Sequence, residues 1–338
     1  MRIRGRESSH TEAREMLRSL LWPAAALYSF GSRLRASLYA RGHLESLRLR
    51  RPVLSVGNLT LGGTGKTPCV IALQEMLTAR DVAVHVVSRG YGGRLEGPVR
   101  VDPVKHSAED VGDEPLLLAA FGPVWVSKDR AAGAKAAAAA GAEVLVLDDG
   151  FQNPAVAKDL SIVVVDARKG FGNGRCIPAG PLREPVEVGL ARADMVISIG
   201  DETAQRLFMT SAPPFDLPHV KAWLEPLQTG MDWDGARVLA FAGIGHPEKF
   251  FATLRSMGAD VLHGEALSDH QPLTPALMAR LEGDAAKLGA QLVTTEKDAV
   301  RLPFQFRQKV LTVPVRLKSN NVQMIEDAVQ PLLPAKGD

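Results

Sequence analysis

Residues 52–68 read PVLSVGNLTLGGTGKTP, an apolar run that leads into a glycine-rich turn ending in Gly-Lys-Thr. In phosphate-binding loops of this kind, backbone N–H groups converge on phosphate oxygens, the lysine reaches the β- and γ-phosphates, and the next hydroxyl ligates Mg²⁺. Lys66 and Thr67 occupy these two positions. A strand, the loop and a helix over residues 68–79 follow in the required order. The sequence therefore favours binding of a nucleoside triphosphate over a plain glycine-rich turn.

The loop departs from the usual G-x-x-x-x-G-K-[ST] spacing at its first position, where Thr60 stands in place of glycine. Three glycines follow closely, at positions 62, 63 and 65. We expect them to supply the missing backbone freedom, because glycine adopts positive φ angles without a steric penalty.

The length of the chain and its hydrophobic content predict two domains, and its cysteine content predicts a reducing compartment. A chain of 338 residues with 46% hydrophobic composition can bury one large core or two modest ones. Cys69 and Cys176 are its only cysteines, and they have neither metal-like spacing nor a disulfide framework to build. This pattern is typical of a cytosolic protein.

The N-terminal segment is basic and needs an explanation of its own. Residues 1–51 carry eleven arginines against four glutamates, a balance of +7, whereas the whole chain has a formal charge of only +2. Arg18 and Arg33 enclose 14 uncharged residues, too few to span a bilayer, and no cleavage site marks a signal peptide. A nucleic-acid patch is disfavoured because lysine is absent and no binding module follows.

A helix opening at Pro23 would repeat apolar residues at helical spacing, with arginines on another face. The apolar residues are Leu27, Phe30, Leu34 and Leu38. From the segment alone, two interpretations stay open. The helix lies on an anionic membrane surface, or it packs on the domain with a solvated basic face.

Apolar runs alternating with helical stretches predict a parallel sheet with helices on both faces, an α/β class typical of phosphate-loop NTPases. The expected strands after the loop are residues 82–87, 123–127, 143–149, 161–166 and 193–199. One covering helix is expected over residues 131–140, where alanine dominates.

A second, smaller α/β domain is expected after a linker. Regular patterning lapses over residues 211–235, so we place the domain limits at 1–51, 52–210, 211–235 and 236–338. Strands are expected at residues 237–244, 259–263 and 290–295. KVLTVPVRL (309–317) is expected to be a strand that can pair with residues 219–224, and residues 322–333 a helix.

The doublet Asp148-Asp149 is a candidate for metal binding or catalysis. It follows an apolar strand, and ligands bind at the C-terminal edges of such strands in open α/β sheets. A carboxylate there can hold Mg²⁺ beside the phosphates. The alternatives are a helix N-cap or a solvated turn.

For other candidate site residues, a purely structural role explains the sequence pattern at least as well as a catalytic or binding role. Asp113 and Glu114 precede an apolar helix, where acids complement the helix dipole. His270, beside Asp269, is compatible with a helix cap. SRGYGG (88–93) and the long loop at residues 170–185 are typical of loops that open onto a site, and the latter offers Arg183 to an anion.

Taken in order, the motifs resemble the tetraacyldisaccharide 4'-kinase family. They are SVGNLTLGGTGKTP, SRGYGG, VGDEPLLLA, SKDR, LDDGFQN, GNGRCIPAGPLREP, FAGIGHPEKFF, SDHQPLT and VTTEKDAVRL. LDDGFQ and GPLREP in this order are far more specific than a phosphate loop alone. The motifs cover nearly the whole chain.

The resemblance implies transfer of the γ-phosphate of ATP to the 4'-hydroxyl of a tetraacylated glucosamine disaccharide 1-phosphate. This reaction belongs to lipid A synthesis at the cytoplasmic face of the inner membrane of Gram-negative bacteria. A substrate with several acyl chains cannot leave the bilayer cheaply, since each buried CH₂ contributes about 0.8 kcal/mol. The resemblance therefore favours membrane-surface contact by the basic helix. It implies no obligate protein partner.

The resemblance also assigns roles to residues. Asp113 and His270 correspond to a catalytic dyad that accepts the sugar proton, and Asp149 helps to organise transfer. Arg183 and Tyr91 are candidates for contacting the substrate, and Asp148 joins Thr67 as a ligand of Mg²⁺. The ATP loop comprises Thr60, Leu61, Gly62, Gly63, Thr64, Gly65, Lys66 and Thr67.

One position departs from the family. Many members follow DDGFQ with histidine, whereas this chain has Asn153, to which we assign no catalytic role.

Two rival functions predict different sequence features. A membrane-associated ATPase switch without a sugar-lipid acceptor would carry a signature lysine where Leu61 stands. A GTP-dependent metallochaperone would need a guanine-reading N/T-K-x-D motif, and TTEKD (294–298) has the wrong spacing. In either rival, hydrolysis should proceed without a sugar acceptor.

Overall fold

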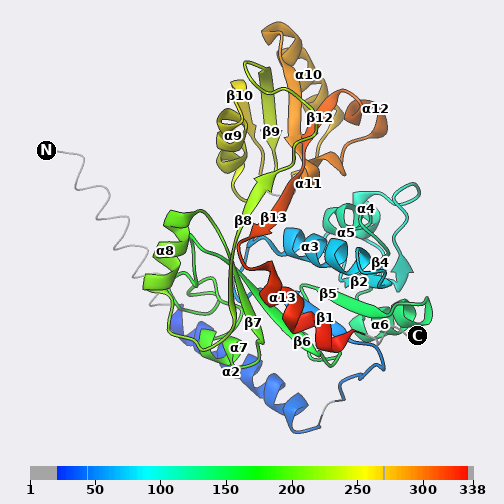
Figure 1. The fold of residues 1–338 in the computed structure, drawn as a ribbon, viewed down its shortest axis with the longest axis vertical. Helices are drawn as coiled ribbons and strands as arrows, with labels where there is room; N and C mark the ends of the chain where they lie inside the picture. Colours follow the sequence, from blue (N-terminus) through cyan, green and yellow to red (C-terminus); the bar gives the residue numbers. More distant parts are fainter. Residues whose placement is uncertain (1–20, 44, 269–270, 334–338) are drawn as a thin grey trace, which may run out of the picture. The chain divides into compact units, whose positions relative to one another are not determined.

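The computed structural model describes residues 21–43, 45–268 and 271–333. Within this part of the chain, strands alternate with helices and form two sheets (Figure 1). Most of the strand pairs are parallel, which confirms the predicted α/β class.

The larger sheet has the strand order β13-β8-β7-β6-β1-β5-β2-β4-β3 among the described residues. Strands β1, β2, β5, β6 and β7 are buried at every residue, as expected for strands covered on both faces. The bounds are β1 (Val53–Gly57), β2 (Val84–Ser88), β3 (Val99–Arg100), β4 (Val124–Val126), β5 (Val144–Asp148), β6 (Leu160–Asp166), β7 (Met195–Ile199), β8 (His219–Pro226) and β13 (Val315–Ser319).

The chain divides into two compact units. The first comprises the residues up to Lys66, then Val146–Trp223, and those from Ser319 onward. Its helices are α2 (Trp22–Ala40), α7 (Val186–Leu190), α8 (Glu202–Ser211), α13 (Val322–Val329) and the 3₁₀ helix η1 (Gln330–Leu332).

The second unit comprises Thr67–Leu145 and Leu224–Lys318. Its helices are α3 (Lys66–Thr78), α4 (Ala108–Val111), α5 (Asp113–Leu118), α6 (Arg130–Ala139), α9 (Pro247–Ser256), α10 (Pro275–Leu288), α11 (Glu296–Ala299) and α12 (Phe304–Arg307).

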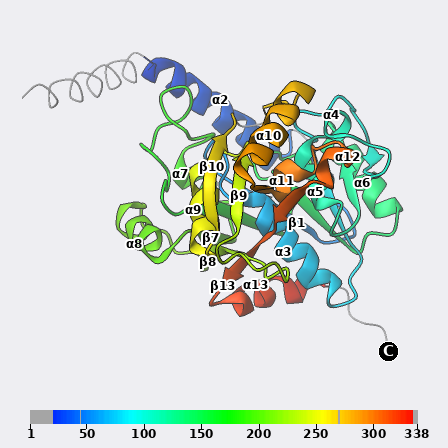
Figure 2. The ribbon, with the colours of Figure 1, turned by 90° about the horizontal axis from the view of Figure 1, so that it is seen from above.

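The smaller sheet lies wholly within the second unit and has the order β10-β9-β11-β12, with every described pair parallel. Its strands are β9 (Arg237–Ala242), β10 (Asp260–Ala266), β11 (Gln291–Thr295) and β12 (Val310–Val313). Helices α9 and α10 cover its opposite faces (Figure 2). Alternate residues of β9 explain this, because Ala240 packs with Phe251 of α9 while Phe241 packs with Leu281 of α10.

One local prediction was wrong and another was confirmed. The stretch at residues 309–317 is not one strand, because β12 ends before Pro314 and β13 begins after it in the other sheet. Proline has no N–H to donate to a ladder, so the chain can change sheets there. Part of the expected linker, His219–Pro226, is strand β8, and it neighbours β13 as the predicted pairing required. The domain limits themselves stay a prediction.

Helix α2 leaves most of its large apolar side chains exposed. Leu27 is 72% exposed and Phe30 64%, and Leu34 is exposed as well. Arg33 is also exposed, whereas Ala25 is buried. No helix in the described part of the chain is long and apolar enough to cross a membrane.

Candidate active site

The phosphate loop joins the end of β1 at Gly57 to the start of α3 at Lys66. Gly65 has a φ of +93°, and a Cβ there would lie 2.5 Å from Ile199 Cδ1. The backbone angle therefore favours glycine at this position, and a side chain there would also have to displace the end of the Ile199 side chain. Thr64 is buried, and no described residue forms a hydrogen bond with its hydroxyl. A buried hydroxyl of this kind suits an anionic ligand held in the loop.

Lys66 shares a carboxylate with Arg183. The Lys66 Nζ lies 3.6 Å from Asp149 Oδ1, and Arg183 Nη1 donates to both Asp149 oxygens at 2.9 and 3.0 Å. Asp149 has a φ of +50°, an unusual backbone angle for a residue with a side chain. This turn directly after β5 places the carboxylate between the two cations.

Arg183 is held beside the loop by backbone pairing. The Leu61 N–H donates to the Pro181 carbonyl at 2.8 Å, and the Arg183 N–H donates to the Leu59 carbonyl at 2.7 Å. Thr60 and Leu182 form an antiparallel bridge between these bonds. The backbone at residues 181–183 is therefore hydrogen-bonded to the first residues of the phosphate loop and held beside them.

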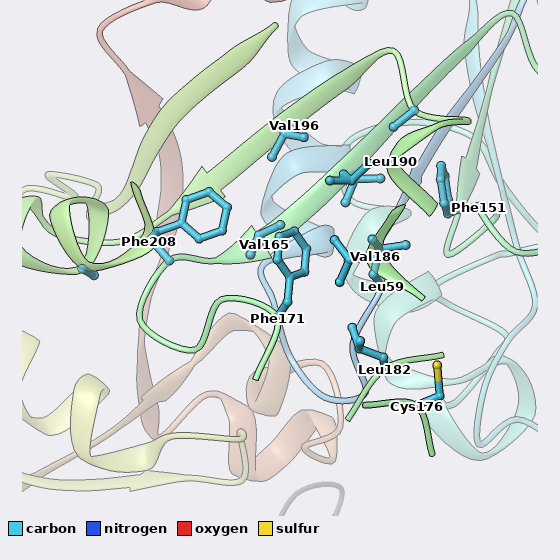
Figure 3. Close-up of a cluster of buried hydrophobic side chains, with 14 residues drawn as sticks. Leu59, Phe151, Val165, Phe171, Cys176, Leu182, Val186, Leu190, Val196 and Phe208 are labelled. Carbon is cyan, nitrogen blue, oxygen red and sulfur yellow. The ribbon is translucent and has the colours of Figure 1, made fainter. Parts of the chain in front are cut away.

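A common hydrophobic core supports these segments (Figure 3). Leu59 comes from the phosphate loop, Phe151 from the segment after Asp149, and Leu182 from the residue before Arg183. All three are at most 2% exposed. Because their side chains belong to one cluster, the backbone of each site segment is fixed relative to the other two.

A buried polar network lies beside this core. Glu184, which is 2% exposed, accepts hydrogen bonds from Arg192 and from Gln152 Nε2, the latter at 3.1 Å. The same Gln152 nitrogen donates to the Asn58 carbonyl at 2.8 Å. The Arg192 guanidinium lies 5.0 Å from the centre of the Phe151 ring. This network ties the loop's first turn to the LDDGFQ and GPLREP segments.

Two predicted metal ligands have suitable donor chemistry. Asp148 ends β5 and is 2% exposed, and Thr67 follows Lys66 on α3. No cluster of three or more His, Cys, Asp or Glu side chains suited to a metal occurs among the described residues. Mg²⁺ in phosphoryl-transfer enzymes usually takes one or two protein ligands plus phosphate oxygens and water. A hydroxyl and a single carboxylate therefore fit this ion.

In the second unit, the SRGYGG and VGDEP segments pack closely against each other. A Cβ on Gly112 would lie 2.6 Å from the Tyr91 carbonyl oxygen, and one on Gly90 would lie 2.8 Å from the Val111 carbonyl oxygen. Gly112 has a φ of +91° and immediately precedes Asp113 at the start of α5. The Tyr91 backbone therefore lies at the N-terminal end of this helix, while its side chain is exposed.

Charged side chains form hydrogen bonds and an ion pair at the SRGYGG segment and beside the VGDEP segment. Lys128, from the SKDR motif, donates to the Gly90 and Gly93 carbonyls at 3.0 and 3.1 Å. Arg94 pairs with Asp110 at 2.6 Å. A hydrogen bond from the Ser107 N–H, followed by one from Arg94, lowers the pKa of Asp110 to about 2. Asp110 therefore remains ionised as a partner for Arg94 at neutral pH.

Asp113 is 5% exposed, and its Oδ1 accepts a hydrogen bond from the Glu114 N–H at 2.9 Å. The Lys297 Nζ lies 3.9 Å from Asp113 Oδ2 and 3.7 Å from Glu114 Oε1. The predicted dyad partner, His270, lies outside the described residues.

The structure thus brings together Lys66, Asp149 and Arg183 in the first unit, and the backbone of Tyr91 with Asp113 in the second. Sequence reasoning assigned no role to the residues that support them. These are Gln152, Glu184, Arg192, Lys128 and Lys297. Four of them lie inside the quoted motifs and Arg192 lies outside them; this was the only signal available, because contacts at long sequence separation leave no local pattern.

Comparisons with known proteins agree with one another. The family model described as tetraacyldisaccharide-1-P 4'-kinase matches residues 17–333. Proteins named tetraacyldisaccharide 4'-kinase from Dinoroseobacter shibae and a Jannaschia species are each 58% identical, over 94% and 93% of this chain and 95% of each relative. A crystal structure of LpxK from Aquifex aeolicus in complex with ATP is 29% identical, with a TM-score of 0.78, over 94% of this chain and 100% of that one.

Proposed function

The chain belongs to the tetraacyldisaccharide-1-P 4'-kinase family, and we propose that the side chains described above transfer the γ-phosphate of ATP to the 4'-hydroxyl of a tetraacylated disaccharide 1-phosphate. The observation that carries this proposal is the phosphate loop with Lys66 and Arg183 on one carboxylate. The solved relative in complex with ATP supports ATP as the phosphate donor. The product is the 4'-phosphate of a lipid A precursor.

The first unit holds the phosphate donor. Residues 60–67 surround the phosphates, and Lys66 leaves Asp149 to meet the β- and γ-phosphates when the nucleotide binds. Thr67 and Asp148 would hold Mg²⁺. When bound, this ion neutralises the charge on the β- and γ-phosphates. Arg183 then supplies a planar guanidinium to an anionic group of the donor or the acceptor.

The second unit supplies the group that receives the proton. Asp113, with His270 as its partner, orients the 4'-hydroxyl and accepts its proton while the oxygen bonds to the γ-phosphorus. The bond from this phosphorus to the bridging oxygen breaks, and ADP leaves. Tyr91, on the loop that packs against the start of α5, contacts the disaccharide.

Helix α2 brings the enzyme to the cytoplasmic face of the inner membrane of a Gram-negative bacterium. Exposure of the apolar Leu27, Phe30 and Leu34 to water is unfavourable, and insertion into a membrane surface would remove it. Arg33 can contact anionic headgroups. This exposure favours the membrane-surface interpretation over a helix packed on the domain. The enzyme needs no obligate protein partner.

The alternative function, an ATPase switch without a sugar-lipid acceptor, has no support in these comparisons. The family model covers the parts of the chain outside the phosphate loop as well, including the VGDEP and VTTEKDAVRL segments. A shared nucleotide loop alone would leave those parts unmatched.

Transfer of labelled γ-phosphate to a tetraacylated disaccharide 1-phosphate in detergent micelles tests the proposal. We expect labelled lipid from the native chain. Asp113→Ala and His270→Ala should lower the rate by about 10²–10⁴-fold, the usual contribution of a general base, while ATP binding is retained. Steady ATP hydrolysis without labelled lipid would reject the kinase function.

A further inference from the structure

Lys297 occupies a position between two acidic side chains of the VGDEP motif. Its Nζ lies within 4 Å of both Asp113 and Glu114, and its side chain is only 22% exposed. Lys297 lies on α11, which packs against α5. The sequence separation between Lys297 and Asp113 shows that this contact depends on the tertiary fold.

The backbone of Lys297 is fixed by a buried network. Thr295 caps α11 by accepting from the Asp298 N–H at 3.2 Å, and its hydroxyl donates to Asp298 Oδ2 at 2.7 Å. Asp298 is fully buried, and it also accepts from the Gly243 N–H at 3.0 Å. Arg301 pairs with the same carboxylate. These buried hydrogen bonds and the ion pair fix the backbone of α11, and with it the backbone position of Lys297.

Glu296 anchors the same helix on another side. It accepts from the Val315 N–H at 3.2 Å and from Arg316 Nη1 at 3.0 Å. The Arg316 guanidinium lies 4.7 Å from the centre of the Phe121 ring, just beyond the end of α5. The start of α11 is therefore linked to both ends of α5, directly through Lys297 and through Arg316 at the other end.

Helix α4 and strand β4, which also pack against α5, carry two acids and no cation. On α4, which packs against α5, Asp110 pairs with Arg94 and Glu109 is the remaining acid. Strand β4, the other packed element, carries no charged residue. Among the described residues, Lys297 is a cation that forms an ion pair with the carboxylate of Asp113.

We propose that Lys297 is a positioning residue for phosphoryl transfer, acting through Asp113. Its ammonium lies 3.9 Å from Asp113 Oδ2 and attracts that oxygen electrostatically, while the Glu114 N–H donates to Oδ1, so the two contacts together favour one orientation of the carboxylate. It also offsets the repulsion between the neighbouring Asp113 and Glu114 carboxylates. This inference rests on the proposed role of Asp113 as the acceptor of the sugar proton.

An ion pair with a purely structural role would make a different prediction. If the pair only stabilised the fold, loss of Lys297 would lower the unfolding temperature but would leave kcat of the folded enzyme unchanged. If Lys297 acts through Asp113, its effect on kcat must disappear once Asp113 is neutralised. A double-mutant cycle separates these two cases.

The cycle compares the native chain, Lys297→Met, Asp113→Asn and the double variant in the lipid phosphorylation assay. Lys297→Met should lower kcat by about 10- to 100-fold, part of the 10²–10⁴-fold that a general base contributes, with the KM for ATP unchanged. In the Asp113→Asn background the same change should alter kcat by less than about twofold. Lys297→Arg should retain more activity than Lys297→Met, because the charge is kept.

Lys287→Met is the matched control, because Lys287 also pairs with an acid but is 80% exposed on α10. It should leave kcat unchanged, and thermal unfolding of every variant checks the fold. Equal losses in the native and Asp113→Asn backgrounds, or no loss from Lys297→Met, would overturn the positioning role. If the native chain itself fails to label the lipid, the proposed function fails instead, so the two failures are distinguishable.

Discussion

Glu184 should carry a large share of the stability of the first unit, although no step of the chemistry uses it. We consider Glu184→Ala. The side chain is almost fully buried, and the change removes the acceptor of hydrogen bonds from Arg192 and Gln152. Gln152 keeps its bond to the Asn58 carbonyl, so its loss is small. Arg192 loses its carboxylate partner.

The magnitude follows from these contacts. Breaking a buried ion pair by removing one partner costs about 3–5 kcal/mol, but Arg192 is 36% exposed and can be rehydrated, which lowers the figure to about 2–3 kcal/mol. The lost Cγ methylene adds roughly 1 kcal/mol. A total of about 3 kcal/mol corresponds to a decrease in Tm of about 6–12 °C for a unit of this size. Glu184→Gln keeps the shape and a neutral acceptor, so about half of this loss is expected.

Thermal and urea unfolding in detergent measure both variants, with Glu187→Ala as the control. Glu187 lies on α7 close in sequence and is exposed, so its replacement should change stability by less than about 0.5 kcal/mol. A loss below about 1 kcal/mol for Glu184→Ala, or an equal loss for Glu187→Ala, would refute the reasoning that the buried network stabilises this unit.

Three further predictions concern the loop, pH and the SRGYGG segment. Gly65→Ala should weaken ATP binding measured by calorimetry at least about fivefold, since positive φ costs about 1–2 kcal/mol and the new methyl meets Ile199. Burial lowers the pKa of His219 below 6.5, so the unfolded chain binds more protons. Stability should therefore fall as pH drops below about 6.5, and urea midpoints for His219→Gln should fall less. Lys128→Ala should raise the KM for the lipid by about threefold to tenfold by loosening the loop of Tyr91, leaving the KM for ATP unchanged.

The sequence predicted those parts of the fold that local patterns determine. The fully buried strands such as β5 read as continuous apolar runs, and α3 begins at Lys66, within two residues of the expected start. The break between β12 and β13 was missed because the apolar pattern continues across Pro314, while the missing N–H ends the ladder there. Strand β8 was placed in a linker because prolines and polar residues on both sides obscured it.

The candidate site was predictable only where a motif encodes chemistry at close spacing. Lys66 and Asp149 fall in motifs whose function is local, and the structure brings them to 3.6 Å. Lys297 and Glu184 could not be found in this way, because a lysine or a glutamate in a polar stretch predicts a solvated surface. Only the packing of α11 on α5 shows that Lys297 has acidic neighbours from a distant part of the chain.

The shared core of Leu59, Phe151 and Leu182 limits how this enzyme can be altered. A change in volume at any one of these residues displaces the backbone of the other two, and with it the phosphate loop, Asp149 and Arg183 together. Attempts to reshape the phosphate loop alone should therefore fail unless compensating changes are made in this core. The first and last of these segments are more than a hundred residues apart in the sequence, yet a substitution in one segment is expected to affect all three.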